Sequence, residues 1–166
     1  GCTVLITSAP TDALVQVEAD FHVQAVEYSR PLAHLKTTDL FTQIAIRRQA
    51  RLGGHDDALL MCGDEVLEGL TWSVVVWGKG GARTSRGAVL PSVTVSLIEE
   101  LARGLGYVFS RGALTLGDLR EADLTLAVSV SHPARALSRV GAEVMRIDRD
   151  LLGSVARAYE GLPLQK

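Results

Sequence analysis

The chain has 166 residues, of which 47% are hydrophobic, and its formal net charge is -2. This length and hydrophobic content suffice for one domain with a sizeable buried core. The balanced charge, without a basic run, argues against binding to nucleic acid. No apolar run reaches the roughly 18–20 residues that span a bilayer. We therefore expect a cytoplasmic protein with neither nucleic acid nor a membrane as its partner.

Cysteine and histidine are placed in a way that predicts neither a disulfide framework nor a metal site. The two cysteines, Cys2 and Cys62, lie 60 positions apart in the numbering. The four histidines do not fall at the spacing of metal ligands. They are His22, His34, His55 and His132. We expect no bound metal ion.

The first half of the chain begins with two strand patterns. Residues 2–9, CTVLITSA, have the β-branched content of a strand already under way, and the first residue is Gly1 rather than methionine. We expect a fragment or a processed product. A turn-rich connection over 10–20 leads to a second alternating stretch, FHVQAVEY, at 21–28. This stretch predicts another strand.

A helix is predicted over residues 39–52. Apolar side chains recur on one side of it, facing away from Gln43 and three arginines. These apolar residues are Leu40, Phe41, Ile44, Ala45 and Ile46. Thr38 or Asp39 is the expected N-cap, and the two glycines at 53 and 54 provide the stop.

The middle of the chain predicts a hairpin and a buried strand. DALLMC at 57–62 and EVLEG at 65–69 are separated by a short turn, and TWSVVVW at 71–77 is strongly apolar. The glycine-rich stretch at 78–87, GKGGARTSRG, is predicted to be an exposed loop rather than a phosphate cradle.

The clearest helix pattern follows Pro91, with Ser92 as the expected N-cap and Gly104 or Gly106 at the end. The remaining predictions are a strand at 107–110, a short helix at 115–122, strands at 124–130 and 134–140, and a helix at 148–162. Strands and helices do not alternate strictly. The fold class is therefore α+β, with a bent, barrel-like mixed sheet and flanking helices.

Lys36 is one of only three lysines among 17 basic residues, and it lies between Leu35 and Thr37. In an apolar setting a lysine loses its proton more readily, because desolvation disfavours the ammonium form, and this suits a nucleophile. The alternative is a surface lysine whose stem is packed and whose amine is in water.

Glu68 lies in an apolar stretch on the predicted hairpin, and a buried carboxylate needs a cationic partner. That partner is either a protonated pyridine nitrogen or an arginine at the sheet edge. The start of the helix at 92–94 offers free backbone N–H groups and a helix dipole, which suit a phosphate. Every capped helix offers the same geometry.

Together these segments resemble a known family. The stretches are HLKTTD at 34–39, DEVLEGLTWSVVV at 64–76, AVLPSVTVSLIEELARGLG at 88–106 and LTLGDLREADLTLAVSVS at 114–131. They resemble the large C-terminal domain of the class IV pyridoxal-phosphate enzymes, which include branched-chain and D-amino-acid aminotransferases and 4-amino-4-deoxychorismate lyase. The resemblance implies that residues 21–166 form the cofactor-binding domain and that residues 1–20 are a remnant of the N-terminal domain and its connection.

The resemblance also implies roles for individual residues. Lys36 would be the catalytic residue, which forms an aldimine with pyridoxal 5'-phosphate and then moves a proton. Glu68 would hold the pyridine nitrogen in its protonated form. The residues implied to contact the cofactor are Lys36, Glu68, Ser92, Val93, Thr94, Ser129 and Ser131. Trp72 and His132 are candidates to line the cleft.

Several positions depart from the family pattern. Leu40 stands where many transaminases have a tyrosine, Ser73 replaces a frequent asparagine, and Ser92 replaces a frequent glycine. The family's small N-terminal domain is not represented, and with it an arginine that contacts the phosphate. Such a contact is among the strongest that a phosphate makes.

Three interpretations remain open from the sequence. The first is an aminotransferase or aminodeoxychorismate-lyase-like enzyme that acts on a small amino substrate. The second is a non-catalytic domain of the same fold that serves binding or assembly. The third is a chain that pairs with a separate N-terminal segment. Members of the family are commonly homodimers, so a partner chain is expected.

Overall fold

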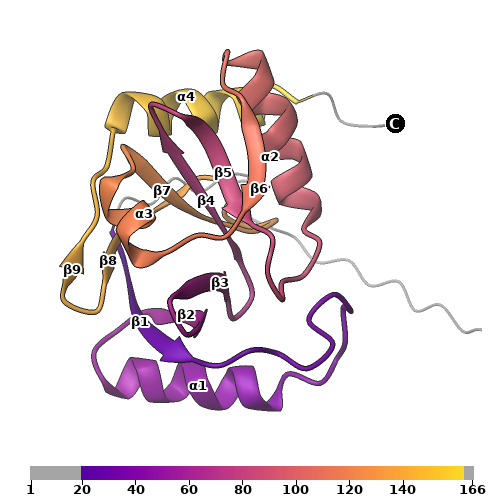
Figure 1. The fold of residues 1–166 in the computed structure, drawn as a ribbon, viewed down its shortest axis with the longest axis vertical. Coiled ribbons are helices and arrows are strands. Elements are labelled where there is room, and N and C mark those ends of the chain that lie inside the picture. Colours follow the sequence, from indigo (N-terminus) through magenta and orange to yellow (C-terminus); the bar gives the residue numbers. More distant parts are fainter. Residues whose placement is uncertain (1–19, 163–166) are drawn as a thin grey trace, which may run out of the picture.

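The computed structural model describes residues 20–162, and within this range the chain forms nine strands and four helices (Figure 1). The strands are β1 (Phe21–Glu27), β2 (Asp57–Cys62), β3 (Glu65–Gly69), β4 (Ser73–Gly78), β5 (Gly81–Ser85), β6 (Phe109–Gly112), β7 (Leu124–Val128), β8 (Arg135–Val140) and β9 (Glu143–Val144). The helices are α1 (Phe41–Leu52), α2 (Val93–Gly104), α3 (Leu116–Glu121) and α4 (Arg149–Glu160). The strand predicted at 2–9 and the connection up to residue 19 lie outside the described residues.

The strands form one mixed, strongly curved sheet. Its order is β3-β2-β1-β8-β7-β4-β5-β6, with β9 paired to β8. β1 is parallel to β2 and β8, and β5 is parallel to β6, whereas the other pairings are antiparallel. The predicted α+β class with a bent mixed sheet is confirmed. Within residues 20–162, no helix is long and apolar enough to cross a membrane.

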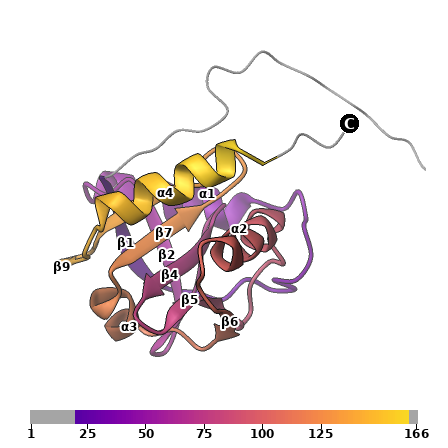
Figure 2. The ribbon, with the colours of Figure 1, turned by 90° about the horizontal axis from the view of Figure 1, so that it is seen from above.

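Both faces of the curved sheet are covered, because side chains alternate along each strand. In β4, Val74 and Val76 pack with Phe21, Trp72 and α3, whereas Val75 and Trp77 pack under α2 and α4. Figure 2 shows α2 and α4 on the same side of the sheet, where they contact one another. This alternation explains the continuous apolar run of β4, since a strand that is buried on both faces has no polar side.

Helix α1 packs on β2 and β3 with a face other than the predicted one. Its buried residues are Gln43 and Ala50, whereas Phe41 and Ile44 are exposed. The small Ala50 allows the helix to approach Ala58 and Leu60 of β2. The most apolar stripe of α1 therefore points away from the sheet.

Two local predictions were wrong. The first concerns the N-cap of α1, which is Leu40 and not Thr38 or Asp39, and no side chain caps this end. The second concerns residues 78–87, where Gly81–Ser85 form strand β5 between β4 and β6. The buried Ala82 and Thr84 alternate with more exposed residues, which is the period of a strand, although the composition is typical of a loop.

Helix starts with polar caps were predicted well. Ser92 caps α2, and its hydroxyl accepts a hydrogen bond from the Val95 N–H at 3.3 Å. Thr115 and Asp118 form a reciprocal capping box at α3. Burial raises the pKa of Asp118, but the hydrogen bonds from Arg83 and Thr115 outweigh it and hold the pKa below its usual value.

The turn between β3 and β4 depends on a close approach between Gly69 and Trp72. The Gly69 N–H donates to the Trp72 carbonyl at 2.8 Å. A Cβ on Gly69 would lie 1.9 Å from Trp72 Cε2, well inside van der Waals contact. The indole cannot easily yield, because it is buried, packs edge-on against Phe21 and donates to Asp57 at 3.1 Å.

Replacing Gly69→Ala is therefore expected to lower the free energy of unfolding by about 1–3 kcal/mol through overpacking. The matched control is Gly104→Ala at the end of α2, where an added Cβ meets nothing within 4 Å. The control should be neutral or stabilising by up to about 1 kcal/mol. Urea denaturation of the two variants tests this, and equal stabilities would contradict it.

Buried Asp57 ties α1 to the sheet. Its carboxylate accepts two hydrogen bonds from Arg47, at 3.1 and 3.0 Å, and one from Trp72 Nε1. Arg47 also donates to Thr71 Oγ1 at 2.8 Å. One network therefore joins α1, β2 and the turn after β3.

Asp57→Asn keeps the shape of the side chain but removes its charge, so Arg47 loses a bidentate ionic partner. We expect a loss of about 1–3 kcal/mol in unfolding free energy, measured by urea denaturation at neutral pH. Glu143→Gln is the control, because the Arg120–Glu143 pair is 3.8 Å long with both side chains more than half exposed. The control should change stability little. If both variants lose the same stability, the network has no special role.

Candidate functional site

One cavity of about 320 Å³ brings together most of the residues predicted to bind the cofactor. We call it the Glu68 cavity. Its walls come from the segment between β1 and α1, the end of β3, the start of α2 and the end of β7. The predicted residues that line it are Lys36, Glu68, Ser92, Val93, Thr94 and Ser129. Ser131 is not among the lining residues.

Lys36 lies in an irregular segment between β1 and α1, and its side chain is exposed. Of the two alternatives left open by the sequence, the structure favours the surface lysine over the desolvated one. The physical reason is that neighbouring Leu35 and Leu40 are themselves exposed and therefore cannot shield the amine from water. Lys36 nevertheless lines the Glu68 cavity, so its amine is on the same side of the molecule as the predicted acid.

Glu68 is 4% exposed, and both of its carboxylate oxygens are engaged. Oε1 accepts from Arg30 Nε at 2.7 Å, and Oε2 accepts from the Leu90 N–H at 3.0 Å. The need for a cationic partner is thus met by an arginine, the second of the two alternatives. Each carboxylate oxygen can accept a further hydrogen bond, so these contacts do not use up its capacity.

The start of α2 forms another wall. The helix has 12 residues and no acidic side chain in its own first turn, which leaves the positive end of its dipole available to an anion. Thr94 is 2% exposed and lines the cavity. Among residues 20–162, the structure gives its hydroxyl no hydrogen-bond partner. The hydroxyl and the first N–H groups of the helix are suited to hold a phosphate.

Ser129 and Ser131 lie on the turn after β7, which closes through two backbone hydrogen bonds between Ser129 and His132. The Ser131 hydroxyl is 3.0 Å from His132 Nδ1 and 3.4 Å from the Ser129 hydroxyl. This turn places Ser129 at both the Glu68 cavity and a second, larger cavity, whereas Ser131 and His132 line only the larger one.

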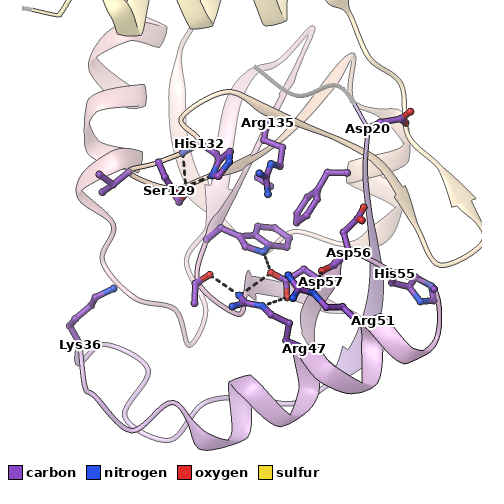
Figure 3. Close-up of a pocket in the computed structure, with 17 residues that line it drawn as sticks. Asp20, Lys36, Arg47, Arg51, His55, Asp56, Asp57, Ser129, His132 and Arg135 are labelled. Atoms are coloured by element: carbon purple, nitrogen blue, oxygen red, sulfur yellow. Dashed lines mark hydrogen bonds and ion pairs between the residues drawn. The ribbon is translucent and has the colours of Figure 1, made fainter. Parts of the chain in front are cut away.

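The larger cavity, of about 1080 Å³, is shown in Figure 3. We call it the Arg47 cavity. It shares five lining residues with the Glu68 cavity, so the two adjoin. The shared residues are Lys36, Thr71, Trp72, Ser129 and Val130. In Figure 3, Lys36 lies apart from the Arg47–Asp57 ion pair, on the side of the cavity toward Ser129. Lys36 therefore stands where the two cavities meet.

The donor set of the Glu68 cavity fits pyridoxal phosphate. It combines an amine, a buried carboxylate with spare acceptor capacity, and a helix start with an unused hydroxyl. Leu40 also lines the cavity, so an apolar group stands where many transaminases have a tyrosine. No group of three or more potential metal ligands occurs in the part of the chain that the structure describes.

Sequence reasoning missed Arg30 and the backbone N–H of Leu90, the two partners of Glu68. Leu90 could not be found, because a backbone donor leaves no trace in the residue type. Arg30 could not be singled out either, because its spacing from Glu68 does not distinguish it from the other arginines of the chain. The predicted burial of Glu68 indicated only that some cationic partner is needed.

Solved structures of other proteins share this fold. A candidate 4-amino-4-deoxychorismate lyase from Legionella pneumophila gives a TM-score of 0.80 at 17% identity, over 90% of this chain and 58% of that one. The branched-chain amino acid aminotransferase from Escherichia coli gives 0.75 at 17% identity, over 86% and 52%. A hypothetical aminotransferase from Mycobacterium tuberculosis, in its pyridoxal-phosphate-bound form, gives 0.73 at 21% identity, over 84% and 54%.

At these identities the likeness shows the fold, and the chain spans little more than half the length of each of these structures. No curated protein is significantly similar in sequence. The sequence model of the class IV amino-transferases, however, matches residues 2–140, which is most of the chain. The chain therefore belongs to the amino-transferase class IV family.

Proposed function

We propose that residues 21–166 are the pyridoxal-phosphate-binding domain of a class IV aminotransferase or 4-amino-4-deoxychorismate lyase, and that residues 1–20 are a remnant of its N-terminal domain and the interdomain connection. The proposal is carried by one observation: a lysine, a buried acid and a helix start line the same cavity of about 320 Å³. A binding module has no need of this combination.

Pyridoxal phosphate supplies an aldehyde that takes up amino groups and a ring that withdraws electrons from the carbon beside them. Lys36 would provide the amine that holds the cofactor and later moves the proton at that carbon. Its position where the two cavities meet supports this role, because a substrate could reach it from the Arg47 cavity.

Glu68 would accept the N–H of the pyridine ring. Burial strengthens such a charge-assisted hydrogen bond, since little water competes for the carboxylate. The hydrogen bond from Leu90 fixes one oxygen relative to the start of α2. Glu68 and the start of α2 would then be held at a constant separation, which suits a cofactor whose pyridine ring is rigid.

The start of α2 would hold the phosphate through its backbone N–H groups and Thr94 Oγ1. Residues outside this chain would complete the site, supplied by a longer form of the protein, by a separate N-terminal segment or by the second copy in a homodimer. The exposure of Leu40 and Val93, which both line the cavity, supports this, because it leaves apolar surface to be covered. The substrate would be a small amino compound.

Replacing Lys36→Ala should abolish the yellow absorbance that we expect when the chain is mixed with pyridoxal phosphate. The matched control is Lys79→Ala, which changes an exposed lysine in the β4–β5 turn and should leave the absorbance unchanged. Borohydride reduction followed by peptide mass measurement should place the added mass on residue 36. A colourless wild-type protein, or label on Lys79 alone, would instead support the non-catalytic binding module.

Replacing Thr94→Val removes a hydroxyl with almost no change in shape. Affinity for pyridoxal phosphate should fall about 10–100-fold, as expected for a lost hydrogen bond to a charged group. Affinity for pyridoxal, which has no phosphate, should stay the same. Ser96→Ala is the control, because it removes an exposed hydroxyl of α2 that does not line the Glu68 cavity. Equal losses for both ligands would contradict a phosphate site at this helix.

The two enzymatic reactions are distinguished by their products. A transaminase converts an amino acid and a keto acid into their counterparts, whereas the lyase releases pyruvate from aminodeoxychorismate. Measuring both in the same preparation tests which reaction applies.

A further inference from the structure

We propose that Arg30 is a positioning residue that clamps the segment carrying Lys36 onto Glu68. One edge of its guanidinium makes two contacts. Nε donates to Glu68 Oε1 at 2.7 Å, and Nη2 donates to the Ala33 carbonyl at 2.7 Å. The side chains of Arg30 and Glu68 are 11% and 6% exposed, so both contacts are largely shielded from water. A single side chain thus joins β3 to the turn that leads to Lys36.

The turn needs this support because its backbone is strained. Leu32 has a φ of 51°, in the left-handed region that non-glycine residues rarely adopt. Such a conformation costs of order 1–3 kcal/mol and persists only where the surroundings enforce it. Leu32 is 64% exposed, so its own burial offsets little of this cost.

Two hydrogen bonds hold the turn in place. The Leu35 N–H donates to the Leu32 carbonyl at 2.8 Å, and Arg30 binds the next carbonyl, that of Ala33. Ala33 is 5% exposed and anchors the turn from inside. Lys36 follows three residues later, with an exposed side chain that makes no hydrogen bond or ion pair within residues 20–162. The direction of the Lys36 segment is therefore set mainly by this turn.

The contact also explains why the clamp is an arginine. A lysine could neutralise Glu68, but its ammonium is a compact point charge on a flexible stem. The guanidinium is planar and directs two parallel N–H groups at two fixed acceptors, a carboxylate and a carbonyl. Arg30→Lys therefore separates the two functions, because it keeps the charge and loses the geometry.

The test begins without the cofactor, so the clamp is judged independently of the proposed function. Hydrogen exchange of Arg30→Lys should be about tenfold faster at the Leu35 amide and in the peptide over residues 31–37, with no change in β7 and α4. Arg83→Lys is the matched control, because Arg83 makes a 2.6 Å ion pair with Asp118 away from this turn. It should leave exchange at 31–37 unchanged.

A second variant guards against loss of the fold. Arg30→Met with Glu68→Met removes both buried charges and should restore global stability relative to Arg30→Met alone. Exchange in the 31–37 peptide should nevertheless stay fast. Wild-type exchange in this peptide for Arg30→Lys, or faster exchange spread equally over the whole chain, would overturn the clamp.

The consequence for the cofactor rests on the proposed function. In Arg30→Lys, pyridoxal phosphate should bind about tenfold more weakly and attach to residue 36 more slowly, as followed by borohydride trapping. If the exchange result holds and wild-type protein binds no cofactor, the proposed function fails and the clamp stands. If the cofactor binds and attaches to Arg30→Lys as it does to wild type, the role of the clamp at this site is overturned.

Discussion

The site depends on the buried carboxylate of Glu68. It receives hydrogen bonds from Arg30 and from the backbone of Leu90, and so joins three parts of the chain that are distant in sequence. These parts are the segment that leads to Lys36, the hairpin strand β3 and the turn that opens α2. A buried charge without these partners would be strongly destabilising. The need to satisfy Glu68 therefore draws the proposed nucleophile and the proposed phosphate site toward one cavity.

The Glu68 cavity is bordered by apolar surface that is exposed to solvent. Exposed apolar side chains surround it, among them Leu40, Val93 and Val130. Phe41 and Ile44 extend the apolar surface along α1. The structures that share the fold are nearly twice as long as the matched part. This exposed apolar surface is what the proposed function would have a further segment or a second copy cover.

Sequence reasoning predicted those features that are set by local chemistry. The cap at Ser92, the helix that follows it and the burial of Glu68 all come from short-range patterns. It failed where contacts between distant segments determine the orientation or the type of an element. The Arg47–Asp57 ion pair and the small Ala50 turn α1 so that its most apolar side faces outward, against the expectation from periodicity. Strand β5 has the composition of a loop, and its pairing with two neighbours makes it a strand.

The sequence left open whether the amine of Lys36 is shielded or exposed. Its apolar neighbours in sequence suggested a shielded amine, yet shielding depends on what packs over them, and Leu35 is itself exposed. Arg30 was missed because the partner of a buried acid is fixed by the fold and not by spacing along the chain. Arg30 follows β1 in the chain, and it reaches Glu68 because the sheet places β1, β2 and β3 in consecutive order.

A crystal structure of the chain grown with pyridoxal phosphate would test the central claim most directly. It should show electron density continuous with the amine of Lys36, the pyridine nitrogen within hydrogen-bond distance of Glu68, and the phosphate at the first N–H groups of α2. A cofactor found only in the Arg47 cavity, or bound with Glu68 contacting nothing beyond Arg30 and Leu90, would contradict it.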